Sequence, residues 1–175
     1  MLSPIEDHQS LTNLNLNGAI EDHRIGNLPC NLNILTLLAS GLTEDPMRVL
    51  GKLPQLRVLN LFASSYLGQE MTCHADQNFP ELRVLKLSFL GNLKLLTVEN
   101  GAMPQLRELE IRSCEKLRSS EGLDQLPALK ELILTDMLLD FVEDARRRLG
   151  NEKLFINNYS NTADVCLVSF ILYLP

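Results

Sequence analysis

Leucines recur along the chain in one pattern, L-x-x-L-x-L, separated by longer mixed segments. The six copies are Leu11-Leu14-Leu16, Leu32-Leu35-Leu37, Leu56-Leu59-Leu61, Leu82-Leu85-Leu87, Leu106-Leu109-Ile111 and Leu129-Leu132-Leu134. Their first leucines are 21, 24, 26, 24 and 23 residues apart. In each copy the second and third apolar residues alternate with another residue, which is the period-two pattern of a strand with one buried face. The pattern therefore predicts six short strands, each followed by a returning segment.

A proline leader precedes most of these strands. Four copies follow an apolar-Pro-x sequence, at Leu53-Pro54, Phe79-Pro80, Met103-Pro104 and Leu126-Pro127, and the second copy follows Leu28-Pro29 with one residue more. Proline has no N–H and disfavours helix in the residue before it, so each leader ends the returning segment. The leaders and a period within roughly 20–29 residues predict leucine-rich repeats. The expected fold is a curved α/β solenoid, with parallel strands on the concave face and an irregular or short helical convex side.

Two further features fit these repeats. Leu93-Leu96-Val98 matches the pattern but begins 11 residues after Leu82, so we expect it in the returning segment of the fourth repeat. Cys114 lies eight residues after Leu106 and has no His or Asp near it in the sequence. We therefore expect Cys114 to be a buried thiol that fills a turn, and not a catalytic one.

The ends of the array differ from its repeats. The predicted organisation is a lead-in over residues 1–10, six repeats over residues 11–139, a capping helix over residues 140–150 and an atypical tail over residues 151–175. The lead-in offers little to cover the leucines of the first repeat, which predicts an array cut from a longer one. The last fifteen residues have no repeat register, and they fit either a final strand or an aberrant C-terminus.

The capping helix is predicted from its end signals. Asp140 and Glu143 have the spacing of a capping box, and Gly150 is placed to end the helix. One apolar face consists of Phe141, Ala145 and Leu149. The arginines at 146–148 fill the last turn, and we expect them to match the helix dipole and face solvent rather than to contact a nucleic acid or a phosphate.

The composition restricts the function. With 22 acidic and 16 Lys/Arg residues the formal charge is −6, which argues against a general nucleic-acid binder. The four cysteines form no CxxC and the three histidines have no metal-ligand spacing, so we expect no metal site. The N-terminal residues have no signal-peptide pattern, and the apolar run over residues 165–174 is shorter than the roughly 18 residues that span a bilayer. We therefore expect a cytoplasmic protein.

No enzyme motif occurs in the sequence. The chain has no G-x-x-x-x-G-K-[ST], H-E-x-x-H, G-x-S-x-G or kinase signature. Paired carboxylates such as Glu108 and Glu110 are common on strand surfaces, and general acid–base catalysis needs a concave, desolvated site. We expect a protein-binding module without catalytic residues and without a cofactor.

The residues between the leucines predict a binding surface on the concave face. Aligning the strands places a contiguous apolar patch on the middle repeats, formed by Ile34, Leu38, Val58, Phe62 and Val84. Beside it lies a charged patch, formed by Glu108, Glu110, Arg112 and Glu131. An exposed apolar patch with a polar rim is typical of a protein-binding site. The alternative is that Val and Ile stand there because β-branched residues suit strands, and Leu38 and Phe62 favour binding.

The later repeats resemble a known family. The stretches are FPELRVLKLSFLGNLKLLTVENGAMPQLRELEIRSCEKL over residues 79–117, EGLDQLPALKEL over residues 121–132, and the helix over residues 141–149. They are similar to the C-terminal repeats of plant disease-resistance proteins, the intracellular coiled-coil, nucleotide-binding, leucine-rich-repeat immune receptors. The sequence contains neither the coiled coil nor the nucleotide-binding region of that family, and its residues after Asn161 are unlike it.

The resemblance implies the recognition arm of an immune receptor. Such an arm binds a pathogen effector, or a host protein that the effector modifies, and contacts the receptor's own nucleotide-binding domain. The implied partners are proteins, with no nucleic acid and no membrane span. Two alternatives remain open, a free-standing intracellular leucine-rich-repeat adaptor or scaffold not involved in immunity, and a non-functional fragment of a resistance locus.

Overall fold

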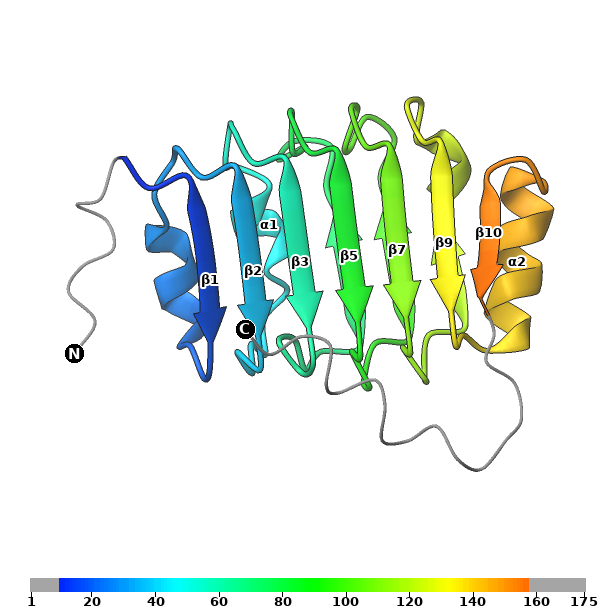
Figure 1. The fold of residues 1–175 in the computed structure, drawn as a ribbon, viewed down its shortest axis with the longest axis horizontal. Coiled ribbons are helices and arrows are strands. Elements are labelled where there is room, and N and C mark those ends of the chain that lie inside the picture. Colours follow the sequence, from blue (N-terminus) through cyan, green and yellow to red (C-terminus); the bar gives the residue numbers. More distant parts are fainter. Residues whose placement is uncertain (1–9, 158–175) are drawn as a thin grey trace.

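The computed structural model describes residues 10–157, which form a solenoid with two parallel β-sheets (Figure 1). The long sheet has the strand order β1-β2-β3-β5-β7-β9-β10. Its strands are β1 (Asn13–Asn17), β2 (Ile34–Leu38), β3 (Val58–Phe62), β5 (Val84–Ser88), β7 (Glu108–Arg112), β9 (Glu131–Thr135) and β10 (Leu154–Asn157). The first six coincide with the six copies of the leucine pattern, so the predicted leucine-rich-repeat solenoid is confirmed.

The returning segments form the opposite side of the solenoid. Three of them contribute a second parallel sheet, made of β4 (Glu70–Cys73), β6 (Leu95–Val98) and β8 (Ser119–Glu121). The segment that contains β8 also contains the short helix η3 (Leu123–Gln125). The other segments contain the short helices η2 (Asp22–Asn27) and α1 (Met47–Leu50), and the longer helix α2 (Leu139–Leu149). Leu96 and Val98 lie in β6, which confirms that this match to the pattern belongs to a returning segment. The second sheet makes the middle of this side more regular than the sequence predicted.

The core lies between the two sheets. Inward leucines of the inner strands, such as Leu85 and Leu109, are 0% exposed, and they meet side chains of the second sheet such as Leu96. Each repeat buries its leucines only by stacking on its neighbours, so the core is one continuous cluster along the array. Cys114 is also fully buried, as predicted, and burial raises the pKa of its thiol to about 11.

Helix α2 starts differently from the prediction. Its N-cap is Leu138 and no side chain caps it, so the predicted capping box of Asp140 and Glu143 is wrong. The burial of Phe141 in the first turn positions the helix in place of a side-chain cap. Gly150 ends the helix as predicted, with a positive φ of 72° and its N–H donating to the Arg146 carbonyl.

Strand β10 extends the long sheet beyond α2, within the segment predicted to be an atypical tail. Leu154 and Ile156 pair with Leu132 and Leu134 of β9. The sequence Asn151-x-x-Leu154-x-Ile156 keeps the repeat pattern with asparagine in place of the first leucine. Helix α2 is therefore the returning segment of the sixth repeat. The N-terminal residues 1–9 and residues 158–175, which include the segment with no repeat register, lie outside the described residues.

Candidate functional site

The outward-facing residues of the long sheet form three rows that cross the strands. Pairing is in register throughout the sheet, so equivalent positions of successive repeats lie side by side. The first row is Asn13, Ile34, Val58, Val84, Glu108 and Glu131; the second is Asn15, Thr36, Asn60, Lys86, Glu110, Ile133 and Phe155; the third is Asn17, Leu38, Phe62, Ser88, Arg112, Thr135 and Asn157. All nine residues that the sequence singled out lie in these rows, which together we call the outward face.

The apolar half of the outward face consists of two strips and is not one contiguous patch. The first strip is Ile34, Val58 and Val84, and the second strip is Leu38 and Phe62. Polar side chains of the second row separate them, and the Asn60 Nδ2 donates a hydrogen bond to Thr36 Oγ1 at 2.9 Å. All five apolar side chains are half-buried, so each keeps part of its surface available.

Lys86 bridges two of the predicted carboxylates. Its Nζ lies 2.8 Å from Glu110 Oε2 and 3.1 Å from Glu108 Oε1. Burial lowers the pKa of Lys86, but the hydrogen bonds and charges of Glu110 and Glu108 outweigh it and raise the pKa above its ordinary value. The sequence alignment placed Lys86 in the second row but did not include it in the site. The single cation offsets one of the two carboxylates, so the bridged group keeps a net negative charge.

Arg112 and Glu131 differ from these bridged groups. Within residues 10–157, neither side chain forms an ion pair or a side-chain hydrogen bond. Arg112 is half-buried, and its Nε is covered and has no acceptor in that part of the chain. Glu131 is exposed at the β9 end of the first row. Counting only contacts among residues 10–157, the charged end of the face therefore offers an unpaired cation and an unpaired anion, at opposite ends of neighbouring strands.

Two features of the face were missed by sequence reasoning. Phe155 is 49% exposed and pairs in register with Ile133, so the β10 end adds an apolar contact that the charged patch did not include. It was missed because β10 was not predicted. The repeat pattern with Asn151 in the first position was the signal that could have found it.

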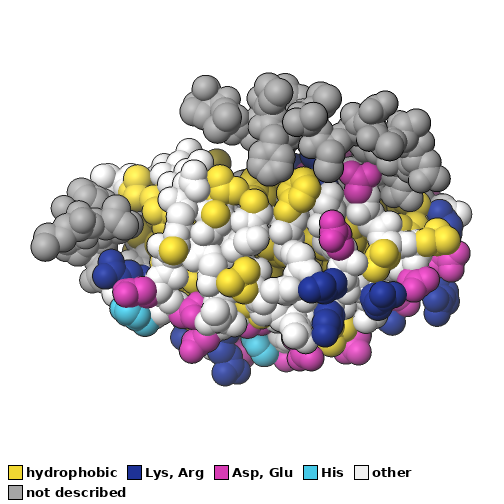
Figure 2. Space-filling view, turned by 90° about the horizontal axis from the view of Figure 1, so that it is seen from below, with side chains coloured by type: hydrophobic (Ala, Val, Ile, Leu, Met, Phe, Trp, Pro, Cys, Tyr) yellow, Lys and Arg dark blue, Asp and Glu magenta, His cyan; other side chains and the backbone are white. Residues whose placement is uncertain are grey.

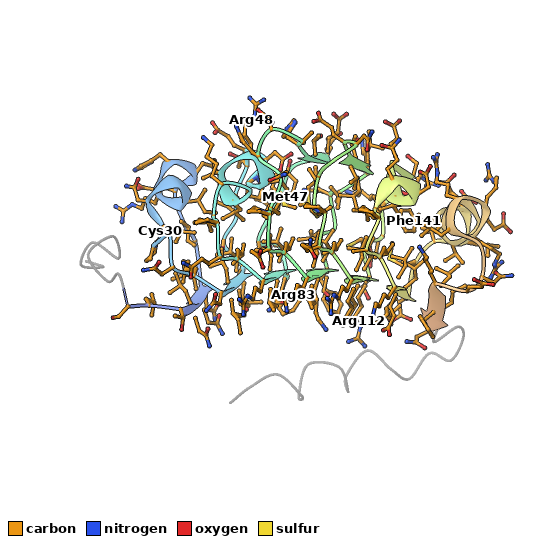
Figure 3. The ribbon with its side chains drawn as sticks, turned by 90° about the horizontal axis from the view of Figure 1, so that it is seen from above. Cys30, Met47, Arg48, Arg83, Arg112 and Phe141 are labelled. Atoms are coloured by element: carbon orange, nitrogen blue, oxygen red, sulfur yellow. The ribbon has the colours of Figure 1, made fainter. Side chains whose placement is uncertain are left out.

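The second missed feature is a column of cations along the edge where the strands begin. In four repeats the residue after the first leucine is basic and exposed, namely Arg57, Arg83, Arg107 and Lys130. The backbone N–H of Arg83 donates to the Arg57 carbonyl at 2.8 Å, and that of Arg107 to the Arg83 carbonyl at 2.9 Å, so these positions adjoin. Glu81 pairs with Arg83 at 3.8 Å, and an exposed pair of this kind adds little stability. Figure 3 shows Arg83 and Arg112 on the sheet side, and Arg48 on the opposite side.

Other features of the described residues lie outside the outward face. In the view from below, charged side chains of both signs are visible along the side of the returning segments (Figure 2). A cavity between η2 and α1 encloses about 20 Å³, against the roughly 300 Å³ or more of a small-molecule site. Among the described residues, no group of three or more His, Cys, Asp and Glu side chains could hold a metal ion. No helix within residues 10–157 is long and apolar enough to cross a membrane.

Comparison with known proteins agrees with the fold. The family model described as "Leucine-rich repeat region" matches residues 22–148. Disease resistance RPP8-like protein 3 of Arabidopsis thaliana is 38% identical over 117 residues, which are 66% of this chain and 13% of that protein. Probable disease resistance protein RF9 of the same plant is 46% identical over 91 residues, or 52% of this chain and 9% of that protein. Disease resistance protein RPP8 of the same plant is 38% identical over 116 residues, again 66% of this chain and 13% of that protein. The chain thus matches only about an eighth or less of the length of these relatives.

Proposed function

Because the chain belongs to the leucine-rich repeat regions of plant disease resistance proteins, we propose that it recognises a protein in the defence response. The leucine-rich repeat region is a non-catalytic protein-binding module. The partner in this proposal is a pathogen effector or a host protein that an effector has modified, met in the cytoplasm. The binding site is the outward face of the long sheet.

The observation that supports this site is the pair of apolar strips on the middle strands of the outward face. Phe62 is a half-buried aromatic in the middle of the face, and Leu38 adjoins it in register. Interfaces concentrate their binding energy in a few central residues, among which aromatic side chains and arginine are enriched. The face has both kinds, because Arg112 lies in the same row as Phe62.

The test is a binding screen followed by substitution on both sides of the solenoid. The 175-residue chain is screened against a panel of purified pathogen effectors and of host proteins treated with them. We expect at least one specific complex, and we expect Phe62→Ala and Val58→Glu to abolish it. The matched control is Leu95→Glu, because Leu95 is a half-buried, outward residue of the second sheet.

Each variant is also checked by circular dichroism and thermal melting. Binding that survives in folded Phe62→Ala and Val58→Glu would place the partner elsewhere. Loss of binding in Leu95→Glu alone would place the partner on the second sheet. A chain that binds no member of the panel would contradict the role in effector recognition.

A further inference from the structure

We propose that the third row binds a protein segment that places an apolar side chain on Phe62 and a carboxylate on Arg112, about 10 Å apart. This inference rests on the proposed function, because it names the chemistry of the partner that the outward face would bind. It assigns Phe62 the role of apolar anchor and Arg112 the role of anion site.

The geometry comes from the register of three strands. Phe62 of β3, Ser88 of β5 and Arg112 of β7 pair in sequence across the sheet. Two strand spacings of about 4.8 Å separate the first from the last. Ser88 is small and 6% exposed, so the two large side chains flank it and both remain half-buried. Leu38 lies on the other side of Phe62 and lengthens the apolar end of the row.

The positive charge of Arg112 favours a carboxylate as the group that the partner places against it. Lys86, the other cation of the outward face, already has two carboxylates within 3.1 Å. Arg112 has none among the described residues, although its guanidinium is partly withdrawn from water. A planar guanidinium binds a carboxylate through two parallel N–H···O bonds, which fixes the direction of the partner as well as its position.

The arginines of the edge column are weaker candidates for this role. Arg57 and Arg107 are exposed, and an ion pair between exposed side chains is screened by water and salt. Arg112 is half-buried between Ser88 and Thr135 of its own row, which are both 6% exposed, so a carboxylate bound there is better shielded than one at an exposed arginine. The same row thus supplies both the apolar contact and the charged contact.

The test uses random linear peptides displayed on phage and selected on the immobilised 175-residue chain. We expect the enriched peptides to pair an apolar residue with Asp or Glu. Their binding should weaken at least about tenfold in Arg112→Gln, as expected for the loss of a charge-assisted hydrogen bond. It should also weaken in Phe62→Ala. Selection on Arg112→Glu should enrich Lys or Arg in place of the acidic residue.

Arg48→Gln is the matched control, because Arg48 is exposed on the side opposite Arg112 (Figure 3). Melting curves establish that each variant is folded. Peptides that need Phe62 but bind Arg112→Gln unchanged would overturn this inference and leave the outward face as the binding site. Peptides that bind Phe62→Ala and Val58→Glu unchanged would overturn both proposals. Selection that enriches no acidic residue would overturn the assignment of Arg112.

Discussion

The Asp45 carboxylate in the second repeat accepts a hydrogen bond from the backbone N–H of Thr72 in the third, with an N···O distance of 2.7 Å. Its other oxygen accepts the N–H of Met47 at 3.0 Å. One side chain thereby satisfies a backbone donor in its own repeat and one in the next. On this side of the solenoid, stacking is reinforced by directed polar bonds as well as by apolar contact.

Carboxylates of the neighbouring repeats also accept backbone N–H bonds from an adjacent repeat. Asp22 accepts the N–H of Thr43 at 2.9 Å, and Glu99 accepts the N–H of Ala75 at 2.9 Å. Each carboxylate reaches a backbone donor 21 to 27 residues away in sequence, which is one repeat. Such bonds help to fix how successive returning segments are stacked behind the long sheet.

We expect Asp45→Ala to lower the free energy of unfolding by about 1–3 kcal/mol, because it leaves two partly buried backbone donors without an acceptor. Urea denaturation followed by circular dichroism measures the change. The matched control is Asp76→Ala, since Asp76 is an exposed aspartate of the same side. If Asp76→Ala lowered the free energy of unfolding as much as Asp45→Ala, the stabilising role of the two hydrogen bonds would be contradicted.

The lowered pKa of Asp22 predicts how the free energy of unfolding depends on pH. Its hydrogen bond from the Thr43 hydroxyl, together with backbone bonds from Thr43 and Glu44, holds its pKa below the ordinary value of 3.8. A carboxyl with a lowered folded pKa stabilises the fold above its unfolded pKa, and this contribution is lost as the pH falls through the folded pKa. Stability should therefore decline below about pH 4.

The variant Asp22→Asn should flatten that decline, measured as the free energy of unfolding in urea at several pH values. Thr43→Val should reproduce most of the effect, because it removes the hydroxyl that lowers the pKa most and keeps the backbone N–H. Asp45 acts in the opposite direction, since burial raises its pKa. If the stability of Asp22→Asn declined below about pH 4 as steeply as that of the unchanged protein, other carboxyl groups would be responsible for the decline.

The position of a leucine in the array should determine how much its substitution by alanine lowers the free energy of unfolding. Leu85 is 0% exposed between two neighbouring repeats, so Leu85→Ala should cost roughly 2–5 kcal/mol. Leu14 occupies the same place in β1 but is only half-buried, so Leu14→Ala should cost less than half as much. Thermal and urea unfolding compare the two variants. Equal costs would contradict the stacking account of the core.

The strands were predictable because the second and third apolar residues of each L-x-x-L-x-L copy alternate with another residue, and because successive copies begin 21 to 26 residues apart. That information also determined the register, since equal positions of successive copies pair, and so it placed Phe62 beside Ser88 and Arg112 in one row of the face. The start of α2 was not predictable, because the burial of Phe141 outweighed the local capping signal at Asp140.

The site was predictable only as a set of neighbouring positions. The sequence places Lys86 near Glu108 and Glu110, but only side-chain conformation determines that both carboxylates bind it. It also determines that Arg112 has no such partner in the part of the chain that the structure describes. The polar row between the apolar strips follows from strand alternation, yet residue type alone suggested one patch. Phe155 was missed because an asparagine replaces the leucine that would have marked its repeat.

The contact between β6 and the turn after β8 gives the sharpest test of repeat stacking. Gly122 has φ of 76°, and a Cβ added there would lie 1.9 Å from the Val98 carbonyl oxygen. In Gly122→Ala, a side chain would stand at a left-handed backbone conformation and would also clash with a backbone atom. The substitution should therefore lower the free energy of unfolding by at least about 2 kcal/mol. Gly101 also has a positive φ, 94°, but a Cβ there would meet only the Ala75 Cβ at 4.0 Å. Gly101→Ala should cost about 1 kcal/mol from strain alone.

Gly91→Ala completes this series as the control, because no atom lies within 4 Å of the added Cβ and its φ is not in the left-handed region. It should change the free energy of unfolding by less than about 0.5 kcal/mol. The expected order of cost is Gly122, then Gly101, then Gly91. Equal costs at Gly122 and Gly101 would mean that the Val98 carbonyl moves away freely. The close approach of neighbouring returning segments would then be a loose contact, and the leucine core with the carboxylate bonds would hold the repeats in register.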